Sequence, residues 1–250
     1  MNSSKAKIFL ASHRCLVESA GVQVFNSLAL NTANCATCPA GTLTMLNEIF
    51  LDAGKSITML PGQEALVVLV AMNGEIGYAE NMEDLATLVS GKTTYFLKQK
   101  GSTACIQNMS EKSTARFFQL VLKSGGGSES QQNQQSTCFL QEDADILFPL
   151  ISGEGENNHR GLNLFAGRFR GRQEVTHRLQ QVESAAFVFV LIGAFEVENR
   201  LVEANDGLLI WNSAAIEMEA LSNDASILII EQPAPQLQER KVLENLPAAC

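Results

Sequence analysis

The pattern of turn glycines between apolar strands occurs twice in this chain. In the first half an apolar run ends at Asn73-Gly74, and in the second half a similar run ends at Gly193. Asn-Gly between two such runs is a strong β-hairpin signal, because both turn residues must adopt positive φ. The offset from Gly74 to Gly193 is 119 positions, and that from Gly91 to Gly207, the next turn glycines, is 116. Two copies of one β-unit are the simplest explanation.

Each copy contains several short apolar strands separated by turn residues. After the hairpins we expect further strands at 93–97 and 115–122 in the first copy, and at 208–211 and 226–231 in the second. Many short strands of this kind predict a sandwich or a barrel, and closing the sheets removes their open edges. The sequence therefore predicts an all-β protein.

A polar stretch separates the two copies. Residues 123–137 include no apolar side chain, and such a segment cannot bury enough surface to offset its ordering entropy. We therefore predict four segments: an N-terminal barrel at 1–122, a flexible linker at 123–139, a C-terminal barrel at 140–235 and a tail at 236–250. Loose helical spacing of Leu237, Val242 and Leu246 predicts a short C-terminal helix in that tail.

The charge balance and the apolar runs exclude several kinds of partner. The formal net charge is −9, so the surface would repel the phosphate backbone of a nucleic acid. No apolar run reaches the roughly 18 residues of a membrane helix. The apolar stretch near the N-terminus is too short for the core of a signal peptide. We expect a cytoplasmic protein without nucleic-acid or membrane partners.

Six cysteines are spread along the chain, and we expect reduced thiols. Cys35 and Cys38 form a CxxC pair, a spacing that can bind zinc or cycle as a redox disulfide. Zinc would need two further ligands, and no second CxxC is present. Pro39 and Gly41 indicate a turn rather than the helix start of a redox motif. Two ordinary loop cysteines are the favoured interpretation, and the other two roles stay open.

Several segments resemble the bacterial pirin-like proteins, a family with members described as quercetin 2,3-dioxygenases. Residues 206–212, Asp-Gly-Leu-Leu-Ile-Trp-Asn, are similar to the C-terminal barrel of that family, as are Ala215-Ile216 after them. In the first half Met45–Glu48, Asp52–Gly54 and Asn73–Glu75 follow the family's order. The resemblance implies two cupin-type (RmlC-like) β-barrels in tandem, a bicupin.

The resemblance also implies a metal site in the N-terminal barrel. The family places a His-x-His pair before the first hairpin and a His-x-Glu pair on a later strand. Counting back from Gly74, the first pair falls near Leu60 and Gly62, and the second falls within residues 104–108. None of these residues is His, Asp or Glu. Imidazole and carboxylate groups are the ligands that suit iron, manganese or nickel in such a site. We therefore expect that the metal site and the dioxygenase activity are lost and that the protein has no cofactor.

We expect the vacated positions to border a cavity in the N-terminal barrel that takes a small molecule. The strands carrying them would contribute six lining residues: Leu60, Gly62, Gln63, Cys105, Gln107 and Asn108. Cys105 could act as a soft metal ligand, but a lone cysteine is more often a buried apolar residue.

The three histidines suggest no second metal site. His177 lies sixteen residues before Gly193, too early for the cupin pair, whose positions hold Leu179 and Gln181. His13 and His159 are equally isolated, and a metal site rarely has one protein ligand. We predict surface or hydrogen-bonded histidines. The chain also has no serine-hydrolase, phosphate-binding or dinucleotide-binding motif, so we name no catalytic residue.

Arginines are concentrated in one segment of this acidic chain. On a strand, Arg168, Arg170 and Arg172 would share one face. They could form a polar outer face paired with carboxylates, a contact with the partner barrel or another subunit, or an anion site.

Two functions remain. One is a pirin-like bicupin without a conventional metal site that binds a small molecule or acts through a protein partner, without catalysis. The alternative is a quercetinase-like dioxygenase or another cupin enzyme with an unorthodox site, since fold does not fix function.

Overall fold

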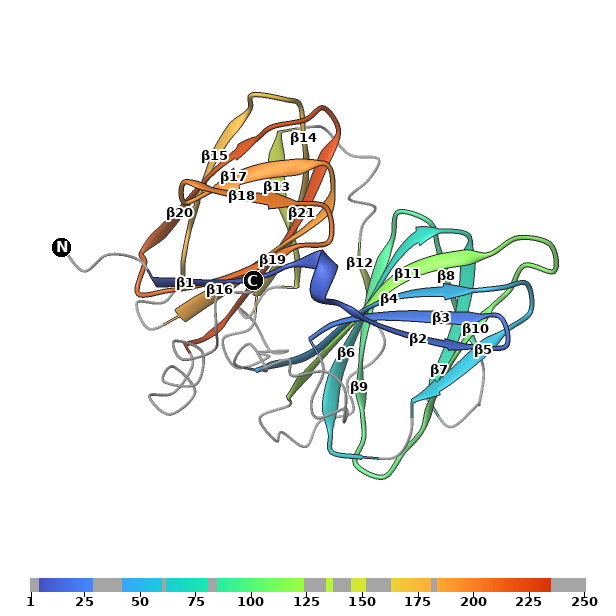
Figure 1. Cartoon of the computed structure of the whole chain (residues 1–250). Coiled ribbons are helices and arrows are strands. Elements are labelled where there is room, and N and C mark those ends of the chain that lie inside the picture. The colour runs from blue at the N-terminus through green and yellow to red at the C-terminus, as the bar shows by residue number, and fades with distance from the viewer. Residues whose placement is uncertain are drawn as a thin grey trace. The chain divides into compact units, whose positions relative to one another are not determined.

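The computed structural model describes residues 5–28, 42–59, 62–80, 85–123, 134–136, 145–151, 163–180 and 184–234. The chain divides into two compact units (Figure 1). We call residues 14–39 and 43–138 the N-terminal barrel, and residues 1–13, 40–42 and 139–250 the C-terminal barrel. Each consists of two antiparallel sheets, which confirms the predicted all-β bicupin architecture. The predicted C-terminal helix lies outside the described residues.

The N-terminal barrel packs a seven-stranded sheet against a four-stranded one. The larger sheet has the order β12-β9-β6-β11-β4-β3-β2, and the smaller has the order β5-β10-β7-β8. The strands are β2 (Cys15–Ser19), β3 (Val22–Leu28), β4 (Leu43–Leu51), β5 (Ser56–Met59), β6 (Ala65–Asn73), β7 (Glu75–Glu80), β8 (Ala86–Val89), β9 (Thr93–Lys98), β10 (Ala104–Asn108), β11 (Ala115–Lys123) and β12 (Gln134–Ser136).

Alternate residues of these strands build one apolar core between the two sheets. On β6, Val67, Leu69 and Ala71 belong to this core, as do Ile76 and Tyr78 on β7. Side chains on a strand alternate between its faces, so residues two apart point into the same core. This alternation decides which polar residues can reach the barrel interior.

The C-terminal barrel repeats the arrangement with a six-stranded and a four-stranded sheet. The orders are β1-β19-β16-β21-β14-β13 and β15-β20-β17-β18. The strands are β1 (Lys5–Phe9), β13 (Ile146–Ile151), β14 (Asn163–Phe169), β15 (Glu174–Arg178), β16 (Ser184–Ile192), β17 (Ala194–Val197), β18 (Arg200–Glu203), β19 (Gly207–Trp211), β20 (Ala215–Ala220) and β21 (Ala225–Pro233).

The first strand of the chain belongs to the C-terminal barrel, which corrects the predicted boundary at residue 1. In Figure 1, β1 runs beside β19, and the two pair in antiparallel register from Lys5 opposite Trp211 to Phe9 opposite Gly207. The short 3-10 helix η1 (Ala11–His13) follows, and the amide of Ala11 donates to Asp206 Oδ1 over 2.7 Å. Pairing with β1 covers the edge that β19 would otherwise expose.

Both glycines turn the chain as predicted, but the hairpins do not form, because the strands on either side of each glycine lie in different sheets: β6 and β7 in the N-terminal barrel, and β16 and β17 in the C-terminal barrel. Gly74 has a φ of 83° between β6 and β7, and Gly193 has a φ of 77° between β16 and β17. The predicted linker is partly ordered, because β12 pairs with β9 from Gln134 opposite Tyr95 to Ser136 opposite Thr93. No helix in the described parts of the chain is long and apolar enough to cross a membrane.

Candidate functional sites

The strands expected to carry metal ligands in the N-terminal barrel present apolar side chains to its interior. On β10, Ala104 and Ile106 belong to the core, and they pair with Met59 and Ile57 on β5. The four side chains therefore lie side by side on one face of the sheet. None is an imidazole or a carboxylate, and the one lone-pair donor among the four, the Met59 thioether, is a soft ligand.

The first group of predicted cavity residues does not form a strand. Gly62 and Gln63 are exposed in the connection between β5 and β6, so the predicted border strand at 60–63 is wrong for these two residues. Leu60 lies outside the described residues. β5 ends at Met59, and the next strand, β6, begins at Ala65.

The second group lies on β10, but its members point in different directions. Cys105 and Gln107 alternate with Ala104 and Ile106, so they lie on the face of the sheet away from the core. Asn108 is buried, and its Nδ2 donates to the carbonyl oxygens of Leu51, Asp52 and Ser113. The Asn108 amide therefore holds neighbouring loops together.

The described interior residues do not fit the transition metal that the resemblance implies. The core of the N-terminal barrel is aliphatic and aromatic, and its buried side-chain donors and acceptors include amides and hydroxyls, which bind such ions poorly. Nowhere in the described chain do three or more His, Cys, Asp or Glu side chains come together as a metal site. No step of a metal-dependent reaction can be assigned to these residues.

A pair of buried amides lies inside the N-terminal barrel instead. Asn47 on β4 shares its face with the core residue Ile49, and Gln119 on β11 shares its face with Phe117. Asn47 Nδ2 donates to Gln119 Oε1 over 3.0 Å, and the two side chains are 5% and 3% exposed. Asn47 Oδ1 and Gln119 Nε2 are buried without hydrogen-bond partners. One acceptor and one donor are thus unused.

Two further polar groups lie in the same core. Tyr78 on β7 and Thr94 on β9 share a hydrogen bond of 3.0 Å between their hydroxyl oxygens, and both residues are buried. The Tyr78 ring stacks on Phe96 with centroids 5.6 Å apart. This hydroxyl pair is satisfied, whereas the amide pair is not.

The C-terminal barrel contains a buried histidine paired with a carboxylate. His177 Nε2 lies 2.7 Å from Glu231 Oε1, and Asn163 Nδ2 donates to Glu231 Oε2 over 3.0 Å. The Phe165 ring packs edge to face on the imidazole with centroids 4.6 Å apart. The prediction of a hydrogen-bonded histidine is confirmed for His177. Sequence reasoning missed Glu231 because 54 residues separate it from His177.

The three arginines do not form a row on one strand. β14 ends at Phe169, so Arg170 and Arg172 lie in the following turn. The backbone amide and guanidinium of Arg170 both donate to Asp145, and Arg172 Nη1 lies 2.8 Å from Glu219 Oε1. The shared strand face was wrong because the strand stops before the second arginine. An anion or interface role for Arg168, Arg170 and Arg172 stays a prediction.

The backbone amide of Arg170 and then its guanidinium hold the pKa of the Asp145 carboxyl below its ordinary value, because both hydrogen bonds favour the ionised form. This carboxylate is therefore a structural anchor of the turn rather than a proton donor near neutral pH.

The cysteines depart in part from the expectation of reduced thiols. Cys105 is free and buried, whereas Cys15 is disulfide-bonded. Cys35 and Cys38 also lie outside those ranges, so their role stays open.

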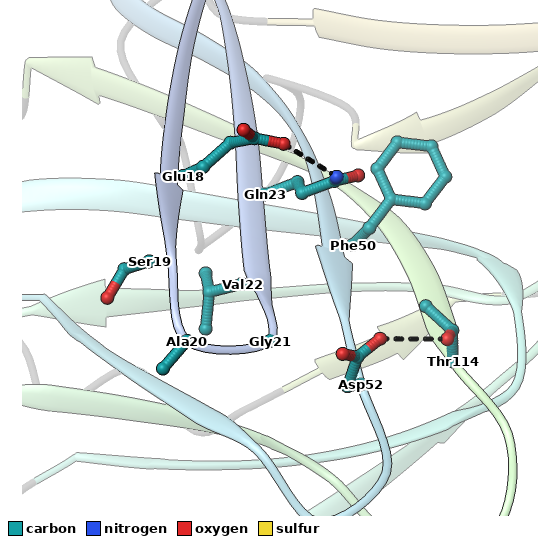
Figure 2. Close-up of a pocket in the computed structure, with 9 residues that line it drawn as sticks. All are labelled: Glu18, Ser19, Ala20, Gly21, Val22, Gln23, Phe50, Asp52 and Thr114. Atoms are coloured by element: carbon teal, nitrogen blue, oxygen red, sulfur yellow. Dashed lines mark hydrogen bonds between the residues drawn. The ribbon is translucent and has the colours of Figure 1, made fainter.

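A surface pocket of about 530 Å³ lies beside the turn between β2 and β3. Figure 2 shows its two carboxylates, each held by a neighbour: Glu18 accepts a hydrogen bond from Gln23, and Asp52 accepts one from Thr114. Because both carboxylates already have partners, the pocket offers little unused chemistry.

A second surface pocket, of about 290 Å³, is lined by five glutamates on the small sheet of the C-terminal barrel: Glu174, Glu196, Glu198, Glu217 and Glu219. Glu198 accepts a hydrogen bond from the Glu217 amide, and Glu219 pairs with Arg172. The glutamates do not converge on one point, consistent with the lack of a described carboxylate metal cluster.

Comparison with known proteins finds similarity to quercetinase-type cupin proteins. The family model for the quercetinase C-terminal cupin domain matches residues 150–232. Quercetin 2,3-dioxygenase of Escherichia coli (strain K12) is 18% identical over 192 residues, which cover 76% of this chain and 82% of that protein.

Two crystal structures share the fold over nearly the whole chain. Bacterial pirin YhhW from Escherichia coli in complex with nickel(II) has a TM-score of 0.79 at 13% identity, covering 92% of this chain and 100% of that one. Quercetin 2,3-dioxygenase from Acinetobacter baumannii has a TM-score of 0.68 at 15% identity, covering 92% and 86%. The family model matches much of the C-terminal barrel, and the two-barrel architecture throughout is that of a pirin-like bicupin.

Proposed function

We propose that this bicupin binds a small molecule in its N-terminal barrel and does not carry out metal-dependent dioxygenation. The observation that carries the proposal is the amide pair of Asn47 and Gln119, which leaves one buried acceptor and one buried donor unused. A regulatory role through a protein partner is compatible with such binding, and we include it in the same proposal. We also include a cytoplasmic location.

The unused atoms favour a ligand of defined chemistry. A buried polar group without a partner costs roughly 1–3 kcal/mol, so a ligand that satisfies both atoms gains affinity from each. It must carry an acceptor for Gln119 Nε2 and a donor for Asn47 Oδ1. The surrounding core is apolar, and burying a charge there is costly. A small neutral amide, such as a lactam, has both groups on an otherwise apolar body.

The proposed function differs from the activity and from the metal that the names of the relatives mention. One relative is a quercetin 2,3-dioxygenase, and the pirin YhhW was crystallised with nickel(II). In this chain the corresponding strands carry Ala104, Ile106, Ile57 and Met59 toward the core. The alternative function, a dioxygenase with an unorthodox site, would require metal ligands from residues other than these.

Binding is tested by calorimetric titration of the full chain with 2-pyrrolidone, δ-valerolactam and benzamide. We expect saturable binding of at least one of these amides to the wild-type protein. We expect at least a tenfold loss of affinity in the double variant Asn47→Leu/Gln119→Leu, because each lost hydrogen bond is worth about 1 kcal/mol.

The matched control is Gln107→Leu, which removes an amide from the outer face of β10. It should bind the amide as the wild type does. Absence of saturable binding for all three amides, or equal affinity in the double variant, would contradict the proposal.

A further inference from the structure

The pair of His177 and Glu231 is held as acid–base groups are held in enzymes. The Glu231 carboxylate contacts His177 Nε2 through one oxygen and Asn163 Nδ2 through the other. The glutamate side chain is 1% exposed and that of the histidine 9%. A carboxylate that is fixed on one side and bonded to a ring nitrogen on the other sets the tautomer and the orientation of the imidazole.

This arrangement leaves the second ring nitrogen available. With the proton on Nε2 directed at Glu231, Nδ1 carries a lone pair. No described residue makes a hydrogen bond to Nδ1, while part of the His177 side chain reaches solvent.

The pair lies inside the C-terminal barrel near one end of its strands. His177 is one residue from the end of β15, Asn163 begins β14, and Glu231 pairs with Asn163 across the sheet. Ser184, the first residue of β16, shares its face with the core residue Ala186, which pairs with Glu231. A serine hydroxyl thus lies on the interior face, two residues along the strand pair from the glutamate.

The surroundings of the pair are apolar. Phe165, Val175 and Leu179 pack against the core, and Ile216 lies opposite His177 on β20. Such a site disfavours charged ligands, since their desolvation is not compensated. It also strengthens the interaction between His177 and Glu231, because electrostatic interactions gain strength in a low-dielectric interior.

We propose that His177 is a general acid–base residue that moves a proton on a small, uncharged carbonyl compound, with Glu231 and Asn163 as positioning residues. His177 Nδ1 takes the proton of a C–H bond next to the carbonyl. The electron pair of that bond forms the carbon–carbon double bond of an enolate, and the carbonyl π pair moves to oxygen, where the Ser184 hydroxyl can donate a hydrogen bond. The imidazolium then returns the proton to carbon. The step needs no co-reactant and no metal.

The test is hydrogen–deuterium exchange at the α-carbons of 2-indanone and cyclohexanone, followed by proton NMR with the full chain in deuterated buffer. We expect the wild type to accelerate the exchange of at least one ketone by about 100-fold over an equal concentration of free imidazole, the lower range for a positioned acid–base group. His177→Gln, whose amide can still donate to Glu231, should lose that acceleration.

Glu231→Gln separates a positioning role from a merely structural one. Removing the negative charge should lower the kcat of the exchange about tenfold and leave its KM unchanged, because the carboxylate no longer orients the imidazole toward a ketone that still binds. Thr176→Val, at an exposed position on the same strand, is the control and should match the wild type.

Thermal unfolding of each variant checks that the barrel is folded. Wild-type rates equal to those of His177→Gln for both ketones would overturn the proposal. An unchanged kcat in Glu231→Gln would overturn the role of the glutamate. These results concern the C-terminal barrel only, so they neither support nor contradict amide binding in the N-terminal barrel.

Discussion

Phe9 and Phe187 pack edge to face with ring centroids 5.5 Å apart, although 178 positions separate them in the sequence. Phe9 ends β1, and Phe187 lies at the middle of β16, on the far side of β19 from β1. The first strand of the chain is therefore tied to the C-terminal barrel by backbone pairing and by an aromatic contact. This explains why a cut between the halves at residue 122 does not separate two complete barrels.

Replacing Phe9 by alanine should destabilise the C-terminal barrel by about 1–3 kcal/mol, less than the 3–5 kcal/mol of a fully buried phenylalanine, because Phe9 is half-buried. Trp211, the only tryptophan, lies on β19 opposite Lys5 of β1, so its fluorescence during urea unfolding reports on this barrel. Leu16→Ala, at an exposed position on β2, should leave the midpoint unchanged. An unaltered midpoint in Phe9→Ala would refute the structural role of β1.

The amide pair predicts a non-additive mutant cycle. Gln119→Leu alone leaves Asn47 buried with no partner and should destabilise the N-terminal barrel by about 1–3 kcal/mol. Asn47→Leu/Gln119→Leu should be destabilised by less than the sum of the single variants, because both partners are removed together. Both tyrosines, Tyr78 and Tyr95, lie in this barrel, so tyrosine absorbance during urea unfolding measures the effect. Strict additivity would argue against a coupled pair.

Two glycines with the same backbone conformation should respond differently to alanine. Gly193 and Gly101 have φ values of 77° and 81°, so an added Cβ strains both by about 1–2 kcal/mol. At Gly193 the Cβ would also collide with Ser222 Oγ, whereas nothing lies within 4 Å at Gly101. Gly193→Ala should therefore lower the stability of its barrel by more than Gly101→Ala lowers that of its own. Equal losses in urea unfolding would contradict the close approach.

The ionisation of Asp145 should make the stability of the C-terminal barrel depend on pH in the acid range. Its pKa is lowered in the folded state by the backbone amide of Arg170 and then by the guanidinium, so ionised Asp145 favours folding. That stability is present above the unfolded pKa of about 3.9 and is lost as the pH falls through the folded pKa.

Asp145→Asn removes this titration while tolerating the positive φ of 74° at the position. The wild type should be more stable than the variant at about pH 6, and the difference should shrink toward about pH 3. The midpoints of urea unfolding of both proteins, followed by Trp211 fluorescence, measure this difference in stability. A difference that is constant over this range would contradict the predicted linkage.

The parts of the fold that were predictable from sequence are those with local signals. Gly74 and Gly193 turn the chain through their positive φ, and the alternating apolar runs identified the strands. The pairing of the flanking strands as hairpins was wrong, because each of these turns leads from one sheet of the barrel to the other. The partner of β1 was not predictable, because strand pairing between distant segments leaves no local trace. The same reason hid the contact of His177 with Glu231.

The site was predicted less well than the fold. The counted positions Gly62 and Gln63 lie in a connection, and Cys105 and Gln107 lie on the outer face of β10, because a shift of one residue reverses the face of a strand. The unused atoms of Asn47 and Gln119 are apparent only once β4 and β11 are paired.

The most direct test of the account is the metal content of the purified full-length protein after incubation with nickel(II), iron(II) or manganese(II) and extensive dialysis. Oxygen uptake with quercetin is recorded on the same samples. We expect far less than one metal ion per chain and no oxygen uptake above buffer. One tightly held ion per chain together with quercetin-dependent oxygen consumption would contradict it.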